Sequence, residues 1–223
     1  MKKVVKFGGS SLANAEQFKK VGEIIRSEES RRYVVPSAPG KRFNGDTKVT
    51  DMLYACYEAA EAGEEFSGKL QAIKERFEEI IKGLSLDLSL EREFEQIAAD
   101  FSAHAGKEYA ASRGEFLNGK VMAAYLGYEF VDAAEVIRFD KNGVLEAEKT
   151  NKLLGKRLAK CEKAVIPGFY GAEDSGKVRT FSRGGSDVTG SLVAKAIMAD
   201  LYENWTDVSG FLVTDPRIVE DPA

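Results

Sequence analysis

Apolar and polar residues follow one another along the chain in blocks that predict alternating strands and helices. Residues 4–7 form a short apolar run, which predicts a buried strand. Phe18, Val21 and Ile25 then recur at the spacing of one face of a helix. The chain is therefore predicted to open with a strand, a turn and a helix.

The same order returns in the next hundred residues. The apolar residues 33–35 lead into a loop at 36–42 that contains two prolines and a glycine, and such a loop cannot continue within a sheet. A helix is predicted at 49–62. Residues 64–110 lack proline and place apolar residues at three- and four-residue steps, which predicts two long surface helices.

The second half of the chain repeats the alternation. Residues 128–137 and 163–171 resemble strands, and a helix is predicted between them at 149–161. A second glycine pair, at 184–185, precedes a further helix. Residues 201–219 predict a strand followed by a hairpin.

This alternation favours a mostly parallel sheet that is buried between helices. The predicted fold class is α/β, a three-layer αβα sandwich around that sheet. Ligands of such folds bind beyond the carboxyl ends of the strands. Both glycine pairs follow predicted strands, so both are expected at the ligand-binding end.

Composition and charge narrow the class of protein. The 223 residues favour one compact unit, and the net charge of −4 is spread along the chain without the basic stripe that a nucleic-acid partner requires. No apolar run reaches the length of a membrane span and no signal-peptide pattern opens the chain, so a cytoplasmic protein without a membrane partner is expected. His104, Cys56 and Cys161 lack the spacing of a metal site.

The stretch KFGGSS at residues 6–11 joins the first strand to the first helix. Gly8 and Gly9 would let the backbone approach a ligand, and the amino end of a helix attracts negative charge. Lys6 adds a cation within the apolar run, although glycines also serve tight strand-to-helix packing. The stretch matches neither a Walker loop nor the dinucleotide fingerprint. A site for an anion is predicted here.

A second polar stretch, SRGGSDVTG, covers residues 182–190. Arg183 could grip a carboxylate or phosphate through two hydrogen bonds, and Asp187 could hold an ammonium group or the water of a cation. An aspartate in the first turn of a helix is also a common capping residue. The glycine pair between Arg183 and Asp187 favours a binding site.

Four segments in this order and spacing resemble the aspartate kinases of the amino acid kinase superfamily. They are KFGGSS, RGE at 113–115, FSRGGSD, and WTDVSGFLVTDPRIV at 205–219. The resemblance extends from Lys3 to Val219. It implies the amino acid kinase fold, with residues 1–223 as the larger part of the catalytic domain; the C-terminal part of that domain and the ACT regulatory domains are absent. Such a piece need not be active alone.

The resemblance assigns roles to individual residues. Lys6 and Asp187 would be catalytic. The ATP phosphates and the rest of the nucleotide would contact Lys6, Gly8, Gly9, Ser10, Thr206, Asp207, Leu212, Asp215 and Arg217. The amino acid would contact Ser37, Thr50, Glu115, Arg183 and Asp187, with Arg183 on its α-carboxylate and Glu115 on its ammonium group. Leu212 departs from the family, which often has tyrosine there.

Several of these residues also have a purely structural interpretation. Thr50 could cap the helix that starts at Asp51, and Ser37 could be only a turn residue. Without its RGE context, Glu115 would be taken for a solvated helix residue. The preference of glycine, and of aspartate before proline, for turns is enough to explain Gly210 and Asp215.

The implied reaction moves the γ-phosphoryl group of ATP to the β-carboxylate of L-aspartate and gives 4-phospho-L-aspartate. This is the first step of lysine, threonine and methionine biosynthesis. ATP and Mg²⁺ are implied, with Mg²⁺ held mainly by the phosphates, and the parent protein is expected to be a homo-oligomer. A carboxylate is already ionised at neutral pH, so no general base is needed. An acetylglutamate kinase, a glutamate 5-kinase and a ligand-binding fragment without turnover are the alternatives.

Overall fold

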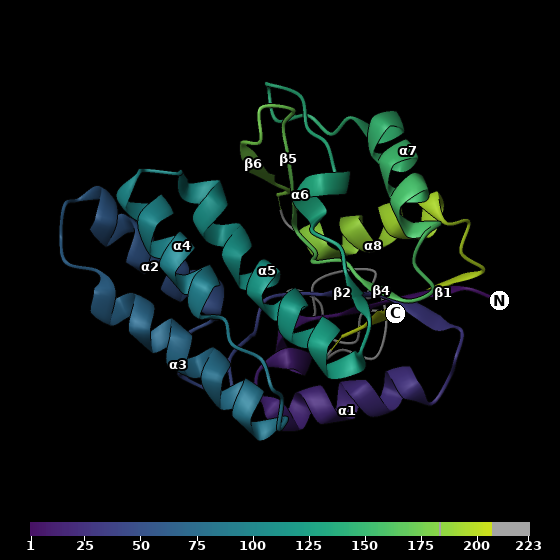
Figure 1. Cartoon of the computed structure of the whole chain (residues 1–223), viewed down its shortest axis with the longest axis horizontal. Helices are drawn as coiled ribbons and strands as arrows, with labels where there is room; N and C mark the ends of the chain where they lie inside the picture. The colour runs from purple at the N-terminus through teal and green to yellow at the C-terminus, as the bar shows by residue number, and fades with distance from the viewer. Residues whose placement is uncertain (183, 207–223) are drawn as a thin grey trace, which may run out of the picture.

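In the part of the chain that the structure describes, a parallel sheet of five strands forms the centre. The computed structural model describes residues 1–182 and 184–206 (Figure 1). The strand order is β3-β4-β2-β1-β7, and every pair is parallel. The strands are β1 (Lys3–Phe7), β2 (Arg31–Pro36), β3 (Glu129–Phe130), β4 (Ala164–Val165) and β7 (Leu201–Trp205). A separate antiparallel pair consists of β5 (Tyr170–Ala172) and β6 (Val178–Thr180).

Helices cover both faces of the sheet, with α1 on one side of the strands and α8 on the other (Figure 1). They are η1 (Gly9–Leu12), α1 (Ala15–Arg26), α2 (Val49–Glu61), α3 (Ser67–Gly83), α4 (Glu91–Ser102), α5 (Lys107–Leu126), α6 (Ala133–Val136), α7 (Ala147–Leu158) and α8 (Gly185–Ala196). Helices α2, α3 and α4 extend away from the sheet beside the first half of α5. None of the helices in the described parts of the chain is both long and apolar enough to cross a bilayer.

The pleat of β1 explains the two apolar layers. Val5 and Phe7 point into a core with α1 and α5, whereas Val4 points into a second core with α7 and α8. All five residues of β1 are buried, as expected for an inner strand of a parallel sheet. Lys6 lies on the Val4 face, at the carboxyl end of the strand.

The predicted α/β sandwich is confirmed, but two of the predicted strands are shorter than expected. At 128–137 only Glu129–Phe130 is a strand, because the Asp132 side chain accepts a hydrogen bond of 2.9 Å from the Ala134 backbone and starts α6. Residues 163–171 split into β4 and the start of β5, which belongs to the other sheet. Pro167 and Gly168 separate them.

Helix α5 follows the two predicted surface helices, α3 and α4, and is buried around its circumference. Twelve of its residues are buried, from Ala110 to Ala123. A helix enclosed on all sides has no polar face, so it lacks the periodic pattern by which surface helices are found. Helix α5 lies beneath the loops that follow β1 and β2, where the candidate site is found.

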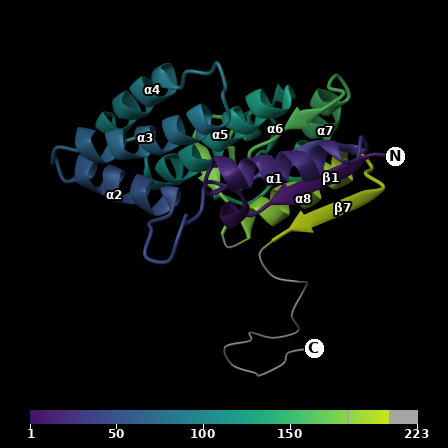
Figure 2. The same ribbon diagram turned by 90° about the horizontal axis from the view of Figure 1, so that it is seen from below.

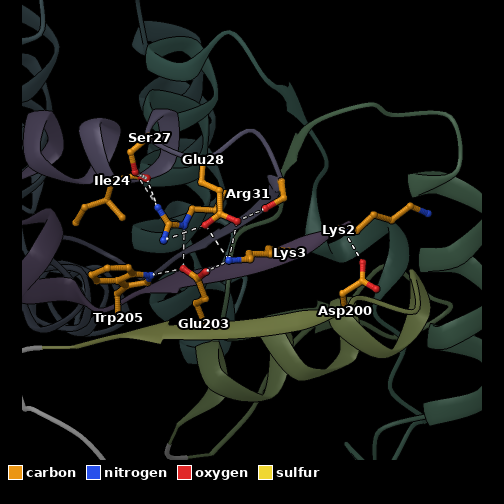
Figure 3. A network of polar contacts seen from close by, with 10 residues as sticks. Lys2, Lys3, Ile24, Ser27, Glu28, Arg31, Asp200, Glu203 and Trp205 are labelled. Carbon is orange, nitrogen blue, oxygen red and sulfur yellow. Dashed lines mark hydrogen bonds and ion pairs between the residues drawn. The ribbon is translucent and has the colours of Figure 1, made fainter.

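Strand β7 lies beside β1, in parallel (Figure 2), and a polar network fixes its carboxyl end. Glu203 forms ion pairs with Lys3 at 3.0 Å and Arg31 at 2.9 Å, and accepts a 2.9 Å hydrogen bond from the Trp205 indole (Figure 3). The Trp205 ring also stacks on Phe7, with centroids 6.0 Å apart. The network therefore holds the end of β7 against β1 and β2.

Candidate functional site

The first glycine turn links the carboxyl ends of three neighbouring strands. The Gly8 amide donates to the Trp205 carbonyl at 3.2 Å, and the Gly9 carbonyl accepts a hydrogen bond from the Gly40 amide at 2.8 Å. A Cβ atom at Gly9 would lie 2.7 Å from the Ala38 carbonyl oxygen. This close approach of two backbones requires glycine at position 9.

The two glycines should respond differently to a methyl group. Gly9→Ala is expected to lower the free energy of unfolding by about 1–3 kcal/mol, because its Cβ meets backbone that cannot move aside easily. Gly8→Ala is the matched control, since Gly8 has φ −71° and no atom closer than 3.9 Å to an added Cβ. Thermal unfolding measures both, and equal shifts would contradict the steric explanation.

The second glycine turn leads into α8. Gly184 has φ 71°, a left-handed conformation that suits glycine, and is the N-cap of the helix. A Cβ atom at Gly185 would lie 2.7 Å from the Phe169 ring. Asp187 is not the cap; its carboxylate pairs with the Lys6 ammonium group at 2.9 Å. The ion pair joins the second glycine turn to β1.

The two glycine turns border one cleft of about 590 Å³. Its described lining residues are Lys6, Gly8, Gly9, Ser37, Tyr54, Phe169, Thr180, Phe181, Ser182, Gly184, Gly185, Ser186 and Asp187. The amino end of α8 opens into this cleft beside the Lys6 ammonium group. Both features favour an anion here.

A second cleft of about 490 Å³ adjoins the first and shares Gly8, Gly9 and Ser37 with it. Its other described lining residues are Ser10, Ala38, Pro39, Gly40, Lys41, Lys48, Thr50, Glu115 and Thr206. The tertiary structure thus brings together, in two neighbouring clefts, predicted residues from six separate parts of the chain.

Glu115 is buried at the floor of the second cleft, with 6% of its surface exposed. Burial raises the pKa of its carboxyl group to about 8, although a backbone hydrogen bond from Ala38 and the nearby Arg113 cation act in the opposite direction. Among the described residues its Oε2 atom has no hydrogen-bond partner. Glu115 is therefore not a solvated helix residue, and its free oxygen can accept a hydrogen bond from a cationic ligand.

Thr50 and Ser37 also have definite positions. Thr50 lies in the first turn of α2, whose N-cap is Lys48, so Thr50 is not the cap. The Ser37 amide donates to the Phe7 carbonyl at 3.1 Å, and the Ser37 carbonyl accepts a 2.6 Å hydrogen bond from the buried Asn118 side chain. These contacts place Ser37 between the clefts.

Several residues of the site were missed by the sequence analysis. Tyr54 and Ser186 line the first cleft, and Asn118 lies one helical turn beyond Glu115 and holds Ser37. Phe169 has φ 79°, a strained value for a residue with a side chain, and also lines this cleft. Asn118 stands three residues after Glu115, and this helical spacing is the sequence signal that could have pointed to it. The predicted site residues Arg183, Asp207, Leu212, Asp215 and Arg217 lie outside the described residues.

Comparison with known proteins places this geometry in a family. A model described as "Amino acid kinase family" matches residues 1–223. The chain belongs to the amino acid kinase family. Among curated relatives, it is 40% identical to Aspartokinase 3 of Bacillus subtilis, over 99% of this chain and 52% of that protein. It is 30% identical to the lysine-sensitive aspartokinase 3 of Escherichia coli, over 97% of this chain and 51% of that protein.

Solved structures of aspartate kinases are similar to this fold. The aspartate kinase of Clostridium acetobutylicum superposes with a TM-score of 0.93 at 52% identity, covering 100% of this chain and 52% of that one. Aspartokinase III of Escherichia coli in complex with aspartate and ADP superposes with a TM-score of 0.82 at 29% identity, covering 100% and 53%. The sequence resemblance to aspartate kinases is confirmed, and the chain spans about half the length of these relatives.

Proposed function

We propose that residues 1–223 form the larger part of the catalytic domain of an aspartate kinase. The enzyme would transfer the γ-phosphoryl group of ATP to the β-carboxylate of L-aspartate and release ADP and 4-phospho-L-aspartate. One observation carries the proposal: the Lys6–Asp187 ion pair and the buried Glu115 border two clefts that share the first glycine turn. The likeness to relatives named as aspartokinases supports the choice of amino acid.

The phosphates of ATP would lie against the first glycine turn. Gly8, Gly9 and Ser10 bring backbone close to the ligand, and the Lys6 ammonium group compensates the charge of the transferred phosphoryl group. Thr206 would contact the nucleotide at the end of β7. Asp207, Leu212, Asp215 and Arg217 remain predicted nucleotide contacts.

The amino acid would lie across the boundary of the clefts. Glu115 would accept a hydrogen bond from the α-ammonium group, which fits its buried position and free carboxyl oxygen. The Ser37 and Thr50 hydroxyl groups border the same space, and Arg183 is the predicted partner of the α-carboxylate. A ligand with one ammonium and two carboxylate groups matches this set.

The proposed chemistry needs positioning and charge compensation rather than proton transfer. A β-carboxylate oxygen attacks the γ-phosphorus, a new phosphorus–oxygen bond forms, and the bond to the ADP oxygen breaks. No proton must leave the nucleophile, which agrees with a site whose described lining residues include no histidine. The barrier is repulsion between two anions, and Lys6 and the amino end of α8 would reduce it. Asp187 would hold the Lys6 side chain in position.

The described residues are compatible with a Mg²⁺ ion that arrives on the triphosphate. No group of three or more His, Cys, Asp or Glu side chains in residues 1–182 and 184–206 could hold a metal ion. Mg²⁺ usually keeps several waters and takes one or two carboxylates in addition to substrate phosphates. Asp187 is the carboxylate in the first cleft that could contribute, directly or through water. The ion would supply charge compensation at the β- and γ-phosphates.

A cytoplasmic location is part of the proposal, because ATP and free aspartate are cytoplasmic metabolites. A homo-oligomeric parent protein, without nucleic-acid or membrane partners, also remains a prediction.

The decisive test is trapping of the acyl phosphate. The full-length protein, with ATP and Mg²⁺, would be given L-aspartate, N-acetyl-L-glutamate or L-glutamate, and hydroxylamine would convert any acyl phosphate to a hydroxamate. We expect the rate with L-aspartate to exceed the others by about 10²-fold or more, since buried polar partners reject ligands that leave them unpaired. Preference for another acid would contradict the proposal. Calorimetric ATP binding without hydroxamate from any acid would indicate a binding module instead.

A further inference from the structure

Arg76 of α3 is a buried cation outside both clefts, with 3% of its surface exposed. Its guanidinium group donates to the Thr47 carbonyl at 2.6 Å and to the Gly40 carbonyl, and pairs with the Asp46 carboxylate at 3.2 Å. Gly40 and Thr47 stand near the two ends of the segment that joins β2 to α2. One side chain from a distant helix therefore fastens both ends of this segment.

The fastened segment, residues 40–48, is a wall of the second cleft. Gly40, Lys41 and Lys48 line that cleft, and Thr50 follows directly in α2. The Gly40 amide donates to the Gly9 carbonyl at 2.8 Å, and a Cβ atom at Gly40 would lie 2.6 Å from the Gly9 carbonyl carbon. Two hydrogen bonds in series thus connect Arg76 to the first glycine turn.

The free-energy cost of burying the Arg76 cation indicates that the cation has a structural role. Burial lowers the pKa of Arg76, and the Asp46 carboxylate partly opposes that effect. Residues 40–48 contain no helix or strand, and the Gly40 and Thr47 carbonyls of this segment receive donors from the Arg76 side chain instead. A planar guanidinium group presents five donors in a fixed fork, and two of its nitrogens here reach two carbonyls and a carboxylate, whereas the ammonium group of a lysine is a single point charge with three donors.

We propose that Arg76 is a positioning residue that holds residues 40–48 against the first glycine turn and so sets the shape of the second cleft. It touches neither cleft, and acts through Gly40 on Gly9 and through Thr47 on the start of α2. The structural part of this inference is independent of the proposed function. Its kinetic consequence rests on that function.

Backbone hydrogen exchange tests the structural part without any ligand. The variants are Arg76→Met, which removes the hydrogen-bond donors, and Arg76→Lys, which keeps the positive charge but not the planar guanidinium group. Lys74→Met is the matched control, because Lys74 is a cation of the same helix whose ion pair, with Glu91 at 2.5 Å, lies outside residues 40–48. All are made in the full-length protein.

We expect Arg76→Met to raise the exchange rate of the Gly40 amide and of residues 40–48 by about tenfold or more, with smaller increases in Arg76→Lys. Amides of β1 and β2 should keep their rates, and Lys74→Met should change the rates of residues 40–48 by less than about twofold. An even increase along α3, or no increase at Gly40, would overturn the inference. Where Arg76→Met fails to fold, Arg76→Lys gives the same comparison.

Kinetics then separate positioning from simple loss of folded protein. Arg76→Lys is expected to raise KM for the amino acid about tenfold and to change kcat less than about threefold, because Lys6 and Asp187 line the first cleft whereas residues 40–48 line the second. A lower kcat with an unchanged KM would indicate only a smaller folded fraction and would contradict positioning. Absence of turnover in the unaltered protein would overturn the proposed function, while the exchange result would still decide the role of Arg76.

Discussion

Replacing Lys6 by methionine is expected to lower kcat by about 10²–10³-fold while KM for aspartate stays within about threefold. Methionine keeps most of the volume of the lysine, which matters because Lys6 is buried in an inner strand. The ammonium group gains importance as negative charge moves between phosphate oxygens, so its loss should affect the transition state more than the bound substrate. Hydroxamate kinetics in the full-length protein measure both constants.

The control for Lys6 is Lys2→Met. Lys2 directly precedes β1, is exposed, and lines neither described cleft. This variant should therefore keep kcat and KM within about twofold. Asp187→Asn should lower kcat less than Lys6→Met, because the ammonium group remains but loses the partner that orients it. Comparable losses of kcat and substrate affinity in Lys6→Met would make Lys6 a binding residue only.

Replacing Glu115 by glutamine is expected to raise KM for aspartate by about 10–10²-fold, the loss of one charge-assisted hydrogen bond. In the unaltered protein the affinity for aspartate should rise as pH increases toward about 8, because the ammonium group prefers the ionised carboxylate and burial holds the pKa of Glu115 near 8. In Glu115→Gln this dependence should disappear. Initial rates at several pH values, with aspartate varied, provide the measurement.

The same substitution should alter the pH dependence of stability. The pKa of Glu115 in the folded protein, about 8, exceeds the ordinary value of 4.5, so the folded state keeps a proton that the unfolded chain releases. The Glu115 contribution to the free energy of unfolding is therefore fully present below pH 4.5 and declines as pH rises through 8. Glu115→Gln removes this decline and should be more stable than the unaltered protein above pH 7.

Denaturant unfolding between pH 5 and 8.5 would record this difference. Glu95→Gln on α4 is the control, since that carboxylate is exposed and should leave the pH dependence unchanged. An unchanged slope in Glu115→Gln would mean that another group is responsible and that Glu115 is ionised in the folded protein. The predicted rise in the affinity for aspartate with pH would then be contradicted as well.

Much of the architecture follows from local sequence. The mainly apolar runs at residues 4–7 and 33–35 form inner strands, because a strand buried on both faces of a parallel sheet needs apolar residues on both of its faces. The glycine pairs at 8–9 and 184–185 form turns between a strand end and a helix, since each includes a position at which a side chain would be strained or would clash. These features, with the order of the polar segments, also identified the family.

The arrangement of the site was decided by tertiary structure. Lys6 and Asp187 are 181 positions apart, and only the packing of α8 against β1 brings their charges within 2.9 Å. Glu115 was predicted as a ligand contact only from its RGE context, because α5 is enclosed on all sides and lacks the periodic pattern that would have shown its burial. Arg76 likewise lies in a helix with many charged residues, and its role comes from residues 40–48 folding back over α3. Local sequence determines which elements form, whereas burial and the meeting of distant charges depend on how those elements pack.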